Sequence, residues 1–174
     1  MEDIGDYQTA LSYAKRSDKL NEQYLSKEHP DYATGKKRVA HIYCKLGKYQ
    51  KAYELDSILF ESVKSIYGES HSLYVDLKNS LSIDYDRLGK KKEGFNMAMQ
   101  VVELCRKYHG ENHPDYATYL QNLGGHYFKD SEYKKALPYL EECRKLRLQN
   151  LGRKSNQYIL DTQQIGRASC RERV

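Results

Sequence analysis

Six histidines are the residues in this chain whose chemistry could support a metal site. His29, His71 and His113 recur at equal intervals, which indicates a repeating architecture that holds them apart in space. His41 and His126 each lack the second histidine four residues away and the carboxylate that a zinc-binding helix carries. We therefore expect no metal site.

Four cysteines and the glycine-rich segments could support other chemistry. The cysteines, at positions 44, 105, 143 and 170, form no CxxC spacing, so we expect reduced thiols and a cytoplasmic protein. No GxSxG, Walker A or GxGxxG motif occurs, and Gly124-Gly125 falls inside a predicted helix. The sequence therefore predicts no catalytic site and no cofactor, which makes this chain a non-enzyme.

A 42-residue repeat organises the chain. The sequence HPDYAT occurs at residues 29–34 and 113–118, and His71 lies halfway between the two copies. Tyr32, Tyr74 and Tyr116 keep the same phase, and a glycine closes each unit. The predicted organisation is a second helix of an incomplete repeat at 1–28, three units at 29–70, 71–112 and 113–154, the start of a fourth unit at 155–164, and a separate tail at 165–174.

Each unit is predicted to contain two antiparallel helices. Proline and an acidic residue after His29 are typical of a first helical turn, and apolar residues follow at three- and four-residue steps. Gly47, Gly89 and Ser131 mark the turn to the second helix. Because two such helices cannot bury both of their faces alone, the units must stack, which predicts an all-α fold of the α-solenoid class.

The third unit contains the residues that suggest a protein family. Leu120, Leu123, Gly124 and Tyr127, followed by Ala136 and Leu140, resemble the tetratricopeptide pattern step for step. With its 42-residue period, the chain resembles the tetratricopeptide repeats of kinesin light chains, which implies a right-handed superhelix. The resemblance implies an interaction scaffold that binds a peptide or partner protein. Similar repeat arrays occur fused to signalling or caspase-like protease domains. The alternative function is therefore the sensor array of such a larger protein.

Three departures from this pattern affect packing. Lys36 and Lys78 stand where Leu120 carries the apolar residue, so we expect either that those two helices pack less tightly or that the lysine stems lie along the protein surface. Gly94 replaces an alanine, at a cost of about 1 kcal/mol. Pro138 lies inside a predicted second helix and is expected to kink it.

The resemblance places a peptide groove along the first helices of successive units. The groove residues it implies are Thr34, Lys37, His41, Lys45, Asp76, Asn79, Ile83, Asp86, Arg87, Thr118, Gln121, Asn122, Phe128 and Lys129. The amides of Asn79, Gln121 and Asn122 can each donate and accept a hydrogen bond, as a peptide bond does. Lys37, Lys45, Arg87 and Lys129 outnumber the acidic residues of this set, which favours an acidic ligand.

The two ends of the chain have their own signals. Residues 165–174 read IGRASCRERV, which resembles the translation of a short-read sequencing adapter, so we expect this tail to be non-native and to make no specific packing contribution. Without it the formal charge falls from +5 to +3, and we expect no nucleic-acid partner. No run approaches the roughly 18 apolar residues of a membrane helix, so we expect no membrane partner. The remainder reads as a fragment of a longer array, whose uncapped ends favour self-association.

Overall fold

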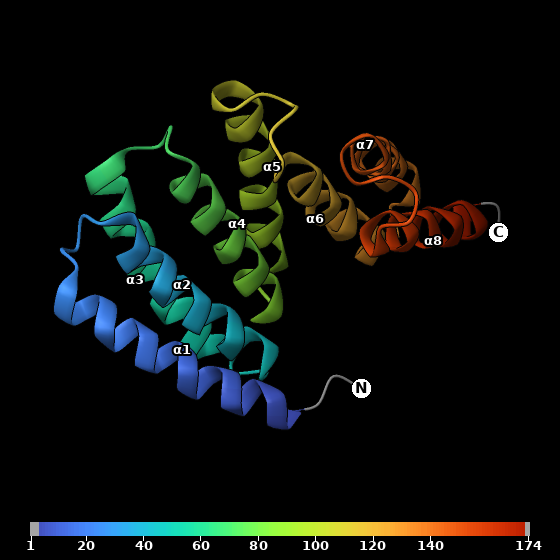
Figure 1. Cartoon of the computed structure of the whole chain (residues 1–174). Coiled ribbons are helices and arrows are strands. Elements are labelled where there is room, and N and C mark those ends of the chain that lie inside the picture. Colours follow the sequence, from blue (N-terminus) through green and yellow to red (C-terminus); the bar gives the residue numbers. More distant parts are fainter. Residues whose placement is uncertain (1–3, 173–174) are drawn as a thin grey trace. The chain divides into compact units, whose positions relative to one another are not determined.

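A computed structural model describes residues 4–172, and within that range every regular element is an α-helix (Figure 1). The helices are α1 (Ile4–Tyr24), α2 (Pro30–Lys45), α3 (Tyr49–Tyr67), α4 (Ser72–Arg87), α5 (Lys91–Tyr108), α6 (Tyr116–Lys129), α7 (Tyr133–Leu151) and α8 (Asn156–Glu172). The prediction of an all-α fold is therefore confirmed for the described residues.

The chain forms two compact units, and the division between them falls after Met97, inside α5. The N-terminal unit (residues 4–97) holds α1 to α4, and in it α1 packs on α2, α2 on α3 and α3 on α4, with α2 also beside α4 (Figure 1). The C-terminal unit (residues 98–172) holds α6 to α8, and in it α7 packs on both α6 and α8. Helices that follow one another in the chain therefore pair as hairpins within each unit.

The repeated histidines cap the starts of the first helices. The Nδ1 atom of His29 accepts a hydrogen bond from the backbone N–H of Asp31, and that of His71 accepts one from Leu73, over 3.2 and 3.1 Å. His113 makes the same contact with Asp115 over 3.3 Å, although α6 itself begins only at Tyr116. For His29 and His71 the regular spacing therefore reflects N-capping, which satisfies backbone donors that the helix leaves unpaired, whereas His113 makes its contact in the turn before α6.

The turns between first and second helices need a backbone conformation that glycine adopts easily. Gly47 and Gly89 have φ angles of 72° and 81°, and Ser131 takes the equivalent position with φ 62°. Ser131 is the single non-glycine residue with positive φ among the described residues. Because its Cβ crowds the backbone there, the turn between α6 and α7 carries strain that the other two turns avoid.

Small residues allow the helices of one hairpin to approach closely. Ala40 and Ser82 are fully buried, and Ser82 Oγ donates a hydrogen bond to the carbonyl of Gly94 over 2.8 Å. A methyl group added to the Cα of Gly124 would lie 2.9 Å from Cδ2 of Leu140, closer than real contacts allow. An alanine at this position would therefore force the Leu140 side chain to shift at the crossing of α6 and α7.

The lysine and proline departures from the repeat pattern are accommodated in different ways. Lys36 is half-buried and its Nζ bonds Oδ2 of Asp18 over 3.2 Å, while Nζ of Lys78 lies 5.5 Å from the centre of the Tyr74 ring. Both lysine stems thus run along the protein, as expected. Helix α7 continues through Pro138, which lies near its start and faces solvent.

The expectation that residues 165–174 make no packing contribution is wrong for the part of this segment that the structure describes. Ile165 is 9% exposed and packs in a cluster with Ala136 and Leu140 of α7, and Ala168 is fully buried. Ile165 stands one repeat after Leu123, so it holds the apolar phase. An apolar residue at this phase packs against α7 whatever the origin of the codon, and the adapter origin stays a hypothesis.

Candidate peptide-binding groove

The predicted groove residues lie on the first helices of the hairpins. Four are on α2 and five on α4 in the N-terminal unit, and five are on α6 in the C-terminal unit. In the N-terminal unit Nζ of Lys37 on α2 pairs with Oδ2 of Asp76 on α4. This ion pair brings together two predicted groove residues that are 39 positions apart in the chain.

The remaining groove residues of the N-terminal unit differ in exposure. His41, Lys45 and Arg87 are exposed, whereas Asn79 is only 8% exposed. Desolvation lowers the pKa of His41, and the nearby charges of Lys45 and Lys37 lower it further. His41 is therefore a neutral imidazole at neutral pH, able both to donate and to accept a hydrogen bond.

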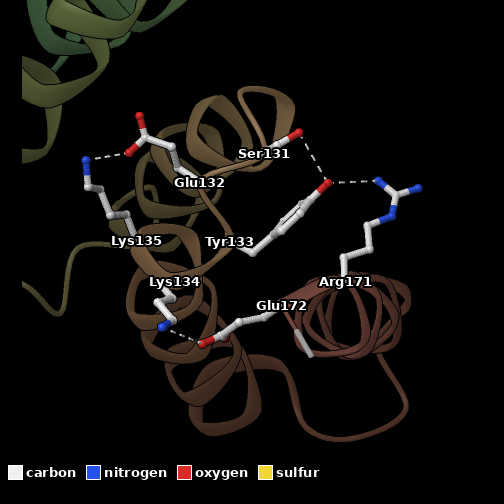
Figure 2. Close-up of a pocket in the computed structure, with 7 residues that line it drawn as sticks. All are labelled: Ser131, Glu132, Tyr133, Lys134, Lys135, Arg171 and Glu172. Atoms are coloured by element: carbon white, nitrogen blue, oxygen red, sulfur yellow. Dashed lines mark hydrogen bonds and ion pairs between the residues drawn. The ribbon is translucent and has the colours of Figure 1, made fainter. Parts of the chain in front are cut away.

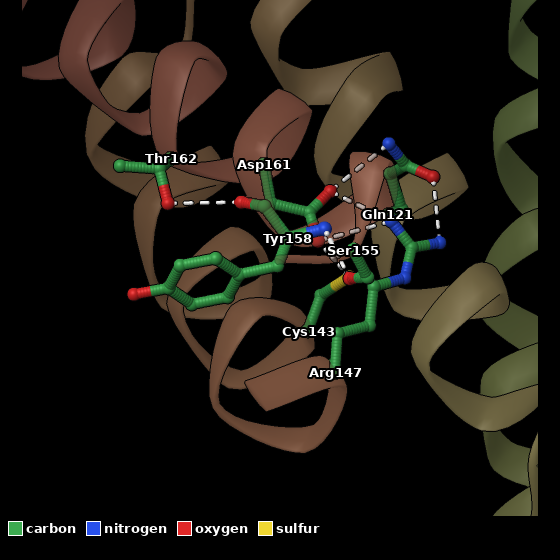
Figure 3. A network of polar contacts seen from close by, with 7 residues as sticks. All are labelled: Gln121, Cys143, Arg147, Ser155, Tyr158, Asp161 and Thr162. Atoms are coloured by element: carbon green, nitrogen blue, oxygen red, sulfur yellow. Dashed lines mark hydrogen bonds and ion pairs between the residues drawn. The ribbon is translucent and has the colours of Figure 1, made fainter. Parts of the chain in front are cut away.

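On α6, the groove residue Gln121 is already engaged in a polar network (Figure 3). Its Nε2 donates to Oδ1 of Asp161 over 3.1 Å, and its Oε1 accepts from Nη2 of Arg147 over 2.9 Å. Both functional atoms of this amide thus have partners within the protein. Phe128 packs edge-on against Tyr133, with ring centres 5.3 Å apart, which leaves it half-buried.

The centre of this network is an ion pair that the sequence analysis missed. Arg147 donates from Nη1 to both carboxylate oxygens of Asp161, over 2.8 and 3.0 Å, and both residues are buried. Figure 3 shows these side chains, from α7 and α8, pointing toward one another. The repeat held a signal for this burial, because Arg147 stands one repeat after the buried Cys105, and Asp161 stands one repeat after the buried Tyr119.

A pocket of about 430 Å³ adjoins Arg147. Its lining contains one predicted groove residue, Thr118, and is otherwise formed by Asn112, Pro114, Ala117, Arg147, Asn150, Leu151 and Gln157. Three of these side chains are amides, and the charge of the guanidinium is neutralised by Asp161. The pocket therefore suits polar, uncharged groups such as the backbone of a bound peptide.

A second hollow, of about 450 Å³, lies where α7 begins (Figure 2). It is lined by residues 131–135 together with Arg171 and Glu172. Arg171 Nη1 lies 3.5 Å from the hydroxyl of Tyr133, and Lys134 lies 4.0 Å from Glu172. Since part of its wall comes from the segment that resembles adapter sequence, we assign no function to this hollow.

Two further carboxyl groups that sequence reasoning missed, Asp56 and Asp84, are buried in the N-terminal unit. Desolvation raises the pKa of Asp56 to about 8 and that of Asp84 to about 7. Within residues 4–172 no three His, Cys, Asp or Glu side chains gather as a metal site would require. In the same range no helix is both long and apolar enough to span a membrane.

The paired helices, the capped helix starts and the small residues at the crossings define the class of this protein. It is an all-α helical-repeat protein of the α-solenoid class. Residues 92–149 match the family model of the tetratricopeptide repeat, and the chain as a whole has the tetratricopeptide-repeat fold. A search of curated protein sequences found no match.

Solved structures of repeat proteins are similar to the chain in fold. The nearly identical TPR-like repeats described for a Podosopora anserina kinesin light chain share 20% identity over 97% of this chain and 79% of theirs, with a TM-score of 0.73. BtubC (BKLC) from P. vanneervenii shares 22% identity over 97% of this chain and 67% of its own, with a TM-score of 0.76. The apo form of RapI matches 83% of this chain and 51% of its own at 23% identity, with a TM-score of 0.64. The suggested resemblance to kinesin-light-chain-like repeats is therefore confirmed at the level of fold.

Proposed function

We propose that this protein is an interaction scaffold that binds a peptide segment of a partner protein along its first helices. The observation that carries the proposal is the Lys37–Asp76 ion pair, because it joins the groove residues of α2 and α4 into one surface. A surface made from neighbouring helices of a rigid repeat suits an extended ligand. No catalytic role enters this proposal.

The charges on this surface favour an acidic peptide. Lys37 is paired with Asp76, whereas Lys45 and Arg87 are exposed and present cationic groups to solvent. His41 adds a neutral donor and acceptor on the same helix as Lys45. Each exposed charge pair contributes only about 0.2–1 kcal/mol, so the complex should be weak and sensitive to salt.

The amide side chains contribute less to this proposal than the sequence suggested. Asn79 is 8% exposed, and the amide of Gln121 is bonded to Arg147 and Asp161. We therefore assign recognition in the N-terminal unit to Lys45, Arg87 and His41, with Asp86 and Ile83 at their sides. In the C-terminal unit the proposal keeps Thr118, Asn122 and Lys129.

Selection from a random peptide library on the immobilised protein tests the proposal. Peptides rich in Asp and Glu should be enriched, and the charge-reversal double variant Lys45→Glu/Arg87→Glu should weaken their binding by about tenfold or more in low salt. The matched control is Lys19→Glu/Lys92→Glu, which changes the net charge equally at exposed positions on α1 and α5. Circular dichroism checks that every variant stays helical.

Two results would contradict the groove assignment. One is equal loss of binding in the groove variant and in the control, which would indicate attraction by net charge alone. The other is enrichment of peptides that still bind the groove variant as well as the parent. Neither result bears on the fold, because both variants alter only exposed side chains.

A further inference from the structure

Asp56 on α3 and Asp84 on α4 meet inside the N-terminal unit. They are 3% and 2% exposed, and their carboxyl groups are hydrogen-bonded to each other. Oδ1 of Asp56 and Oδ2 of Asp84 are buried, and neither atom has a hydrogen-bond partner with a donor N–H or O–H group among the described residues. Two carboxyl groups can bond to each other only if at least one of them carries a proton, because an ionised carboxylate has no donor.

The repeat positions of this pair are apolar in two other copies. One repeat earlier they hold Ala14 and Ile42, which belong to one apolar cluster of the same unit. Two repeats later they hold Leu140 and Ala168, both fully buried. Between α3 and α4, two acids therefore stand in place of small and apolar side chains. They are buried from water like the residues at the equivalent positions of the other repeats.

The charged groups that face the pair do not neutralise it. Lys37 on α2 is the cation that acts on Asp56, but its Nζ is paired with Asp76. Cys44 on α2 lies near both acids and near Arg87 and Lys45, and burial raises the pKa of its thiol, which keeps it uncharged. On α5, Glu93 acts on Tyr85, the neighbour of Asp84. Within residues 4–172 neither acid forms an ion pair.

Burial and like charge both oppose ionisation of the pair. Two carboxylates in a dry site would each lose hydration and would repel each other at hydrogen-bond distance. The pKa of Asp56 is raised to about 8 by desolvation and then by Asp84, and that of Asp84 to about 7 by desolvation. The two groups titrate as one coupled system.

We propose that Asp56 and Asp84 form a proton-binding site that makes the α3–α4 junction sensitive to pH. At acidic and neutral pH the site holds a proton between the carboxyls and α3 stays packed on α4. At alkaline pH the proton leaves, two negative charges face each other without a cation, and the junction loosens.

The sign of the effect follows from proton linkage. In the unfolded chain both acids titrate near their ordinary values, about 4, whereas in the folded chain they keep protons up to about 7 to 8. The folded state binds more protons over this interval, so the stability that the pair contributes is full below about pH 4 and falls as the pH rises toward 8. One acid with a folded pKa of about 7 increases the unfolding equilibrium constant about tenfold between about pH 6 and about pH 9.

The experiment compares the full chain with Asp56→Ala/Asp84→Ile, which recreates the Ala14–Ile42 pair of the preceding junction. Urea unfolding is followed at several values between about pH 6 and about pH 9, and hydrogen exchange reports on the amides of α3 and α4. The folding equilibrium constant of the parent should fall at least about tenfold across this range, and that of the double variant should fall much less. Glu54→Ala/Glu61→Ala removes two exposed carboxyls from α3 and should keep the parent's pH profile.

Infrared spectroscopy detects the protonated carboxyl group itself, which a purely structural role of the two residues would not require. The parent at about pH 6 should show the carbonyl band of a protonated carboxylic acid, and Asp56→Ala/Asp84→Ile should lack it. If that variant does not fold, Asp56→Asn/Asp84→Asn takes its place, because two amides can still bond to each other. Equal pH profiles in the parent and the folded variant, or no acid band in the parent at about pH 6, would overturn the proposal.

Discussion

Arg147 and Asp161 form an ion pair inside the C-terminal unit, with Nη1 and Oδ1 2.8 Å apart and side chains that are 7% and 0% exposed. The residues that hold the same repeat positions in the N-terminal unit are Val63 and Leu77, both buried. A charged pair thus stands where an earlier copy of the repeat uses aliphatic side chains. Such a pair contributes little net stability when intact but costs a great deal when it is broken.

Removal of one partner of this ion pair should therefore be severe. We expect Asp161→Ala to lower the free energy of unfolding by about 3–5 kcal/mol, because the guanidinium of Arg147 would stay buried without its anion. The double variant Arg147→Val/Asp161→Leu, which copies Val63 and Leu77, should be about as stable as the parent or more stable. Urea unfolding followed by circular dichroism measures both. A double variant as unstable as the single one would argue against this account.

The turn between α6 and α7 should become more stable when its strain is removed. Ser131 adopts φ 62°, where a side chain is disfavoured and glycine is not. Ser131→Gly should raise the free energy of unfolding by about 0.5–1 kcal/mol, after the loss of its 3.4 Å contact with the Tyr133 hydroxyl is included. The reverse change, Gly89→Ser, should destabilise the equivalent turn. Thermal unfolding in which both changes have the same sign would refute this explanation.

Two adjacent glycines of α6 should respond to alanine in opposite directions. At Gly124 the new methyl group would lie 2.9 Å from Leu140, whereas at Gly125 no atom lies within 4 Å. Gly124→Ala should cost about 1–3 kcal/mol through overpacking, and Gly125→Ala should stabilise the helix by about 0.5–1 kcal/mol. Urea midpoints of the two variants decide the matter, and a stabilising Gly124→Ala would mean that α6 and α7 are less closely packed.

The contribution of Ile165 can be measured against a second isoleucine of the same helix. Ile165 is 9% exposed and packs on Ala136 and Leu140, whereas Ile159 is 44% exposed. Ile165→Ala should lower the free energy of unfolding by about 2–4 kcal/mol, and Ile159→Ala should change it by less than about 1 kcal/mol. Equal small effects of the two variants would mean that Ile165 makes no specific packing contribution, as the sequence predicted for residues 165–174.

The 42-residue phase by itself determined most of the local structure. The spacing of His29, His71 and His113 marks the helix starts, because His29 and His71 cap the helices that follow them and His113 makes the equivalent contact just before α6. The apolar steps within each unit predict helices, since a 3.6-residue period places such residues on one face. Glycine at position 124 predicts a close helix crossing, since the other units also place a small residue at this phase. These signals are local or strictly periodic, and one sequence suffices to read them.

Only the tertiary structure decided which polar side chains are buried together. Asp56 and Asp84 are 28 positions apart and Arg147 and Asp161 are 14 apart, and each residue taken alone looks like an ordinary solvated charge. Their partners become apparent when helices stack, since burial of an ionisable group depends on what the neighbouring helix brings to it. The same stacking buried Asn79 and gave the amide of Gln121 its partners inside the protein. The exposure of a side chain depends on which helices pack around it, and the periodicity of one helix does not define that packing.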